Sequence, residues 1–214
     1  MAFPTTDMEG HAQLRERVEA ALDRALEEPQ IDFKESAPWE SLKWSITKSV
    51  LGMGNLREGG LLIVGVSERN DVWQLDGIVE ADLATFDADD LASHLDKYVS
   101  PAPNVEAVVH LREGRKFLVL DIHEFDDLPF VCKKNGPGSS GLEQGAVYTR
   151  PTGGVPRTER VRTAEDMRDL MRLAAEKGAR SIVEQARRLD LLPGAHADAA
   201  SVDRRRYDEE LGDL

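Results

Sequence analysis

The sequence predicts an α+β fold in which flanking helices cover a single mixed sheet. Segments with helical and with strand periodicity mix along the 214 residues without the regular alternation of a doubly wound parallel sheet. The apolar run Leu61-Leu62-Ile63-Val64-Gly65-Val66 is typical of a central strand that is covered on both faces. The length suits one main domain with appendages.

Apolar spacing and prolines predict the amino-terminal elements. A helix is expected over residues 11–28, where apolar residues recur at steps of four until Pro29: Leu14, Val18, Leu22 and Leu26. A short strand is expected over residues 31–34. Pro38 then suits the first turn of a second helix, whose apolar face is expected to be core: Trp39, Leu42, Ile46, Val50 and Met53.

The middle of the chain predicts strands around one acidic helix. We expect, in order, a short strand over 72–75, an acidic helix over 80–99, a hairpin of strands 105–111 and 116–125 turning at Glu113-Gly114, and two strands over 130–133 and 146–150. The last two strands flank a loop rich in glycine and are expected to form a basic hairpin. Cys132 is interpreted as packing within this hairpin.

Beyond Val161 the chain is expected to be helical again. Thr163 can cap one helix, and a further helix is expected after Gly178. Residues 193–214 have no apolar period and are expected to be a mobile tail or a segment that binds a partner. The expected divisions of the chain are residues 1–163 for the main domain, 164–192 for the carboxy-terminal helices and 193–214 for the tail.

The charge is strongly negative but uneven. A net charge of −13 argues against nonspecific adhesion to nucleic acid, because polyanions attract basic surfaces. Residues 129–163 reverse the balance, with six basic residues against two acids. Four of these bases could follow a phosphate backbone, and Tyr148 or Trp73 could offer a stacking face; the bases are Lys133, Lys134, Arg150 and Arg157. The alternative is that they are scattered charges that aid solubility.

Composition predicts a cytoplasmic protein. No apolar run approaches the roughly 20 residues that span a bilayer, and residues 1–10 lack the pattern of a signal peptide. We therefore expect no membrane association. The single cysteine has no cysteine or histidine partners at metal spacing, so a structural zinc site is not expected.

The pentapeptide Asp32-Phe33-Lys34-Glu35-Ser36 is the most informative stretch. Strand periodicity of two puts Asp32 and Lys34 on one face, opposite Ile31 and Phe33. A carboxylate beside an ammonium suits a metal ion and a phosphate. The alternative is a solvated edge strand with an ordinary ion pair.

Several segments in this order resemble the Schlafen-type AlbA-like domain. The resemblance covers roughly residues 14–163 and is carried by Glu27 with Asp32-Phe33-Lys34-Glu35-Ser36, by Asn55 to Gly60 before the strand that ends Gly65-Val66-Ser67-Glu68, by Pro129-Phe130-Val131-Cys132-Lys133 and by Tyr148-Thr149-Arg150. It implies an α+β Schlafen/AlbA-like fold, to which the helices expected after Thr163 add a carboxy-terminal helical extension. Members bind nucleic acid; some are metal-dependent endoribonucleases on structured RNA such as transfer RNA, and others act in antiviral defence or transcriptional control.

The resemblance also implies site residues. In nuclease members three carboxylates hold the metal, and by motif they fall on Glu27, Asp32 and Glu68, with Glu28 competing for the first place. Mg2+ or Mn2+ is the implied ion, and Lys34 would stabilise the transition state. This chain departs from the pattern by having an aspartate at position 32 and a single acid in Ser67-Glu68. Asn55 and Gly59-Gly60 are interpreted as a helix end and a tight turn.

Three functions follow as hypotheses. The first is a metal-dependent endoribonuclease or nuclease of the Schlafen type, acting in anti-phage defence, with RNA favoured as substrate. The second is a non-catalytic nucleic-acid-binding or regulatory subunit that docks a partner protein through its carboxy-terminal helices, which could also pair in a homo-oligomer. The third is a nucleotide-binding module, and it is the weakest because the phosphate-binding pattern Gly-x4-Gly-Lys-Ser/Thr is absent.

Overall fold

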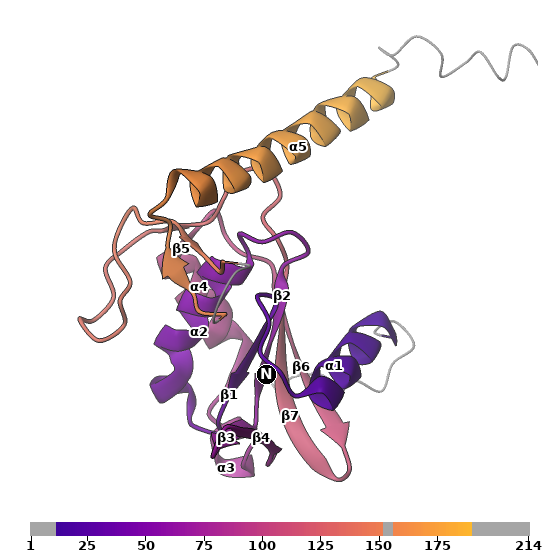
Figure 1. The fold of residues 1–214 in the computed structure, drawn as a ribbon, viewed down its shortest axis with the longest axis vertical. Coiled ribbons are helices and arrows are strands. Elements are labelled where there is room, and N and C mark those ends of the chain that lie inside the picture. The colour runs from indigo at the N-terminus through magenta and orange to yellow at the C-terminus, as the bar shows by residue number, and fades with distance from the viewer. Residues whose placement is uncertain (1–11, 152–155, 190–214) are drawn as a thin grey trace, which may run out of the picture. The chain divides into compact units, whose positions relative to one another are not determined.

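A four-stranded mixed sheet forms the centre of the protein, as the sequence predicts (Figure 1). This computed structural model describes residues 12–151 and 156–189. The strands lie in the order β1 (Ile31–Lys34), β2 (Gly60–Val64), β7 (Arg115–Ile122) and β6 (Val105–Arg112). β1 runs parallel to β2, whereas the β2–β7 and β7–β6 pairs are antiparallel. β1 is therefore an outer strand of this sheet.

Helices cover both faces of the sheet. In Figure 1, α1 (Ala12–Arg24) lies on one side, and α2 (Trp39–Met53) and α4 (Ala88–Tyr98) lie on the other. Side chains on a strand alternate between the faces, so Ile31 and Phe33 of β1 join the core under α1. The α1 residues in that core are Leu14, Val18, Ala21 and Leu22. Asp32 and Lys34 consequently face the α2 side.

The strand β2 confirms the prediction of a central strand. All five of its residues are buried, as its nearly continuous apolar run implies. Gly59 precedes the strand with φ +65°, and a Cβ there would lie 1.9 Å from the carbonyl oxygen of Ile122. Only glycine fits this turn, because any side chain would collide with the backbone of the neighbouring strand β7.

One predicted hairpin and one predicted short strand are also confirmed. β6 and β7 pair through the turn at Glu113 and Gly114, whose positive φ angles of 50° and 76° suit a tight hairpin turn. The predicted short strand over 72–75 is β4 (Val72–Leu75), which pairs with β3 (Val66–Arg69).

The predicted helix over 80–99 is divided in two. A short helix, α3 (Glu80–Leu83), precedes α4, and the chain between them is not helical. Asp87 has extended backbone, and its carboxylate accepts hydrogen bonds from the backbone N–H groups of Asp89 and Asp90. The prediction of one helix was wrong because this aspartate caps a new helix.

The predicted basic hairpin of residues 130–133 and 146–150 is not formed as such. β8 (Val131–Cys132) pairs with β5 (Val99–Ser100), and β9 (Tyr148–Thr149) pairs with β10 (Glu159–Arg160). A single bridge between Val131 and Val147 connects the two segments. Residues 131–132 pair with a strand earlier in the chain and residues 148–149 pair with one later in the chain, so the predicted basic residues lie beside two small sheets rather than on one hairpin.

The ends of two helices differ from the prediction. α1 ends at Arg24, Ala25 has φ 44°, and Leu26 is 56% exposed instead of extending the buried stripe. The two predicted carboxy-terminal helices are one helix, α5 (Ala164–Arg188), which continues through Gly178. Thr163 caps it as expected, accepting a hydrogen bond from the N–H of Asp166.

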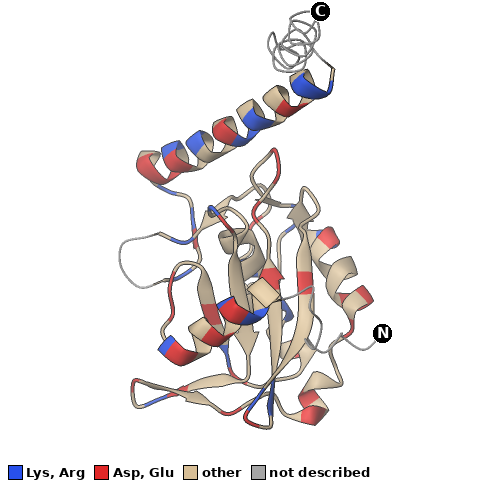
Figure 2. Ribbon diagram, turned by 90° about the vertical axis from the view of Figure 1, so that its right-hand side faces the viewer, with Lys and Arg blue, Asp and Glu red and all other residues tan. Residues whose placement is uncertain are grey.

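The chain divides into two compact units, residues 1–171 and 172–214. The expected division at residue 163 stays a prediction, and the expected tail over 193–214 lies outside the described residues. Acidic and basic residues are interspersed along α5 (Figure 2). Within the part of the chain that the structure describes, every helix is too short or too polar to cross a membrane.

Candidate functional site

A pocket of about 370 Å³ lies beside β1 and α2. Its walls are mostly polar and carry both signs of charge. Seven of its lining residues are charged, and they come from four separate parts of the chain: Glu27, Asp32, Lys34, Lys48, Glu68, Arg150 and Arg157. Ser45, Ser49, Pro156 and Thr158 complete the wall. The fold therefore brings together all three predicted carboxylates, Lys34 and two of the predicted basic residues.

Asp32 is the most firmly held acid in the pocket. It is 5% exposed, its Oδ1 atom lies 2.7 Å from the Lys34 ammonium, and its Oδ2 atom accepts a 2.6 Å hydrogen bond from the Ser49 hydroxyl. Burial alone would raise the pKa of Asp32, but Lys34, Arg150 and these hydrogen bonds together lower it below its ordinary value. Asp32 is therefore a carboxylate, not a neutral acid, at neutral pH.

Glu27 lies against Asp32 and has the opposite shift. Its Oε1 atom accepts a hydrogen bond from the backbone N–H of Phe33 at 3.0 Å. Burial raises the pKa of Glu27, the neighbouring Asp32 raises it further, and the hydrogen bond from Phe33 only partly opposes them. The two acids form a pair in which one ionises readily and the other reluctantly.

Arg150 is a buried member of the pocket wall. It is 2% exposed, and its guanidinium donates to the carbonyl oxygens of Ile31 at 3.3 Å and Pro156 at 2.7 Å. Its Nη1 atom lies 3.7 Å from Asp32 Oδ1. Arg150 therefore connects β1 to Pro156, which directly precedes Arg157. Its positive charge also balances the buried negative charge of Asp32.

Several polar groups in the pocket have no partner among the described residues. These include two buried atoms, Arg150 Nε and the hydroxyl oxygen of Thr158. Lys48 and Arg157 also line the pocket, and neither forms an ion pair with any residue that the structure describes. Unpaired donors and cations at one place suit an anionic ligand, because a buried donor without an acceptor is costly.

The three predicted metal ligands do not form a metal cage. Within residues 12–151 and 156–189, no group of three or more histidine, cysteine, aspartate or glutamate side chains could hold a metal ion. Glu68 is an exposed residue of β3, whereas both oxygens of Asp32 already have partners. This arrangement does not fit an ion held by the full carboxylate trio.

The other predicted nucleic-acid contacts lie outside the pocket. Lys133 donates to the backbone oxygen and the carboxylate of Asp96 at the end of α4. Lys134 is exposed and does not line the pocket. Tyr148 is 2% exposed, and its hydroxyl is engaged by Gly141 and Glu143, so its ring offers no stacking face. Burial corrects the expectation for Tyr148, which the hairpin interpretation had placed at the surface.

Sequence reasoning missed the contribution of α2. Ser45, Lys48 and Ser49 line the pocket from this helix. Their signal is a polar stripe at helical spacing beside the apolar face of the same helix. Thr158 was also missed, and it has no local signal because only the long-range packing of its segment buries it.

The chain is similar to one protein family and to two solved structures. A family model described as Schlafen, AlbA_2 matches residues 27–155. The crystal structure of the DIP2311 protein from Corynebacterium diphtheriae is 20% identical with a TM-score of 0.48, and the match covers 74% of this chain but only 28% of that one. The solution structure of the amino-terminal domain of a RecG-related protein from Nitrosomonas europaea is 22% identical with a TM-score of 0.44, covering 73% of this chain and 92% of that one. None of the curated proteins compared with the chain matches it.

Proposed function

The chain belongs to the Schlafen AlbA_2 family, and from that premise we propose that it binds a nucleic-acid strand by receiving backbone phosphate in the pocket beside β1 and α2. The observation that carries the proposal is the set of unpaired donors and cations in one pocket: Lys48, Arg157, Arg150 Nε and the Thr158 hydroxyl. Phosphate oxygens are strong acceptors for such groups.

The charges of the pocket suit a phosphate despite the acidity of the whole protein. Asp32 is neutralised by Lys34 and Arg150, and Glu27 ionises reluctantly because of burial and Asp32. Lys48 and Arg157 then supply positive charge that is not cancelled by an ion pair among the described residues. A protein with a net charge of −13 would otherwise repel a polyanion, so the backbone phosphate is expected to bind at this pocket.

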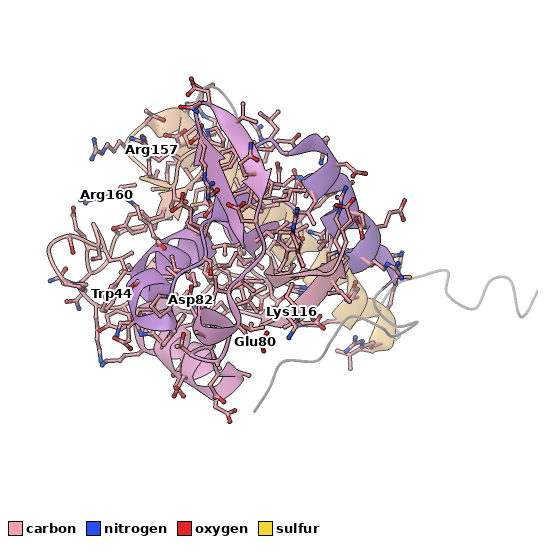
Figure 3. All side chains as sticks on the ribbon, turned by 90° about the horizontal axis from the view of Figure 1, so that it is seen from below. Trp44, Glu80, Asp82, Lys116, Arg157 and Arg160 are labelled. Carbon is pink, nitrogen blue, oxygen red and sulfur yellow. The ribbon has the colours of Figure 1, made fainter. Side chains whose placement is uncertain are left out.

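The experiment compares two arginines of one segment. Arg157 lines the pocket, whereas Arg160 pairs with Glu143 and does not; both are labelled in Figure 3. Arg157→Gln should weaken binding of fluorescent single-stranded RNA and DNA by about three- to tenfold in an anisotropy titration. Arg160→Gln should bind like the wild type. Equal losses in both variants would reject the pocket as the site.

The Glu27–Asp32 pair favours a second candidate function, which is cleavage of the bound strand. Two neighbouring carboxylates beside Lys34 would serve as part of a nuclease site. A divalent ion held by one or two carboxylates together with substrate phosphate would supply the hydrolytic chemistry. The test is incubation of transfer RNA or single-stranded nucleic acid with Mn2+. Cleavage that Asp32→Asn abolishes would support this candidate, and binding without cleavage would support the non-catalytic function.

A further inference from the structure

An aromatic cluster lies where α2 and α4 meet. It consists of Trp44 from α2 with His94 and Tyr98 from α4. The ring of Trp44 lies 5.0 Å from that of His94 and 4.9 Å from that of Tyr98, and His94 and Tyr98 are 4.9 Å apart. All three residues are partly exposed, whereas Trp39 below them is 7% exposed. The cluster is thus the outer part of a group of aromatic rings that pack mostly edge to face, and the inner member of the group, Trp39, is core.

Two lysines border the cluster. The Lys43 ammonium lies 5.6 Å from the ring centre of Trp44, and the Lys97 ammonium lies 5.5 Å from that of Tyr98. Lys97 forms no ion pair with any residue that the structure describes. The nearby acids Glu40 and Asp96 are each paired with a lysine, Lys43 and Lys133 respectively. The border of the cluster is therefore cationic rather than acidic.

His94 is held as a neutral ring within the cluster. Its Nε2 atom lies 3.1 Å from the Thr47 hydroxyl. Burial lowers the pKa of His94, and the charges of Lys43 and Lys97 lower it further against a small opposing effect of Glu40. The Trp44 ring packs edge to face against His94 and Tyr98, at interplanar angles of 68° and 82°, so the neutral imidazole helps to hold the Trp44 ring in place.

The cluster continues directly into the pocket along α2. Trp44 and the pocket residue Lys48 are four residues apart, so they lie on one face of the helix, about 6 Å apart along its axis. A phosphate at Lys48 would bring the adjoining nucleotide within reach of the Trp44 ring.

We propose that the cluster Trp44–His94–Tyr98 stacks with an unpaired base of a single-stranded nucleic acid whose backbone occupies the pocket. This inference rests on the proposed function and names its substrate as a strand with accessible bases. Aromatic side chains beside a cationic groove are how proteins bind single strands without reading their sequence. A base has an apolar face and suits this surface of aromatic rings and lysines.

The test separates stacking from backbone binding. Anisotropy titrations compare a fluorescent oligothymidine strand with an abasic strand of the same length. Trp44→Leu should weaken binding of oligothymidine by about tenfold, because stacking contributes about 1–3 kcal/mol per base by alanine substitution. Its binding of the abasic strand should equal that of the wild type. Trp44→Phe, which keeps an aromatic face, should retain most of the affinity for oligothymidine.

Other outcomes of these titrations would overturn the inference alone or together with the proposed function. If Trp44→Leu binds oligothymidine like the wild type, or loses affinity equally for both strands, the cluster is ordinary helix packing and the inference is overturned while the proposed function stands. If the wild type binds neither strand, the proposed function fails and the inference fails with it. Thermal unfolding followed by circular dichroism verifies that both Trp44 variants are folded.

Discussion

The Ser49 hydroxyl donates a hydrogen bond to the buried Asp32 carboxylate. Ser49→Ala removes the 2.6 Å hydrogen bond to Asp32 Oδ2 and leaves that oxygen without its donor. We expect the free energy of unfolding to fall by about 1–3 kcal/mol, the usual cost of an unsatisfied buried group. Urea denaturation measures this loss. Ser45→Ala is the matched control, since Ser45 lines the same pocket but donates to the Leu42 carbonyl of its own helix. A similar loss in both variants would contradict the prediction.

Glu27 is expected to make stability depend on pH. Its pKa is raised in the folded protein, first by burial and then by Asp32, so its ionisation costs stability as the pH rises above the ordinary value of 4.5. Glu27→Gln keeps an oxygen that can accept from Phe33 N–H but cannot ionise. The variant should be more stable than the wild type at neutral pH, and the difference should shrink as the pH falls through the raised pKa and then below 4.5.

The test measures the unfolding free energies of the wild type and of Glu27→Gln from pH 4 to 8. A difference that stays constant over this range would show that the ionisation of Glu27 is not its cause.

At the residue scale the sequence predicted what lies within one strand. Strand periodicity placed Asp32 and Lys34 on one face, and their 2.7 Å contact confirms it. It could not predict that Arg150 is buried, because this depends on carbonyl oxygens of Ile31 and Pro156 that packing brings to it. The catalytic and binding roles assigned to these residues stay predictions.

Asn55 connects separate elements through one side chain. Its amide donates to the carbonyl oxygens of Phe130 and Tyr148 and accepts from the N–H of Phe130, and the residue is 3% exposed. Asn55→Ala should lower the free energy of unfolding by at least about 2 kcal/mol, because it leaves several buried backbone groups unpaired. Asn135→Ala, which loses one exposed bond to Gln144, should cost about 1 kcal/mol or less. Guanidinium denaturation measures both, and equal effects would refute the expectation.

At the element scale, prediction succeeded where the signal is local and failed where it is not. The turn at Gly114 predicted the β6–β7 hairpin, and the apolar run at residues 61–66 predicted the central strand β2. Both elements are confirmed. Gly178 was expected to divide α5, but one glycine costs a helix only about 1 kcal/mol and does not end it. The partners of β8 and β9 could not be predicted. β8 pairs with β5, which is distant in sequence, and β9 pairs with β10, which lies beyond the expected hairpin.

α5 carries exposed apolar residues, such as Met171 and Ile182. The expected protein partner would be sought at these residues.

The whole molecule is expected to bind nucleic acid with a shallow dependence on salt. The protein has a net charge of −13, and on the proposed function the residues that replace counterions are chiefly the two pocket cations Lys48 and Arg157. On the proposed function, the logarithm of affinity for a single strand should fall with the logarithm of salt concentration with a slope of about −1 to −2, near −0.7 per phosphate contacted. Lys48→Gln should reduce the slope by about 0.7. Lys116→Gln is the control, because Lys116 pairs with Glu80 and does not line the pocket. A slope unchanged in Lys48→Gln would count against the pocket.

The outward backbone of β1 has a consequence for self-association. An open sheet edge is a template on which another chain can add a strand and begin aggregating. Here the outward N–H groups of Ile31 and Phe33 donate to the Glu28 carbonyl and the Glu27 carboxylate, and the outward carbonyls accept from Arg150 and Lys34. Side chains around the pocket therefore also occupy hydrogen-bonding groups of the edge strand β1, which are then not available to another chain. Glu27→Ala removes the acceptor of the Phe33 N–H group and should aggregate more during storage, as measured by light scattering. Glu28→Ala should aggregate less, because it keeps the backbone carbonyl that accepts from the Ile31 N–H group.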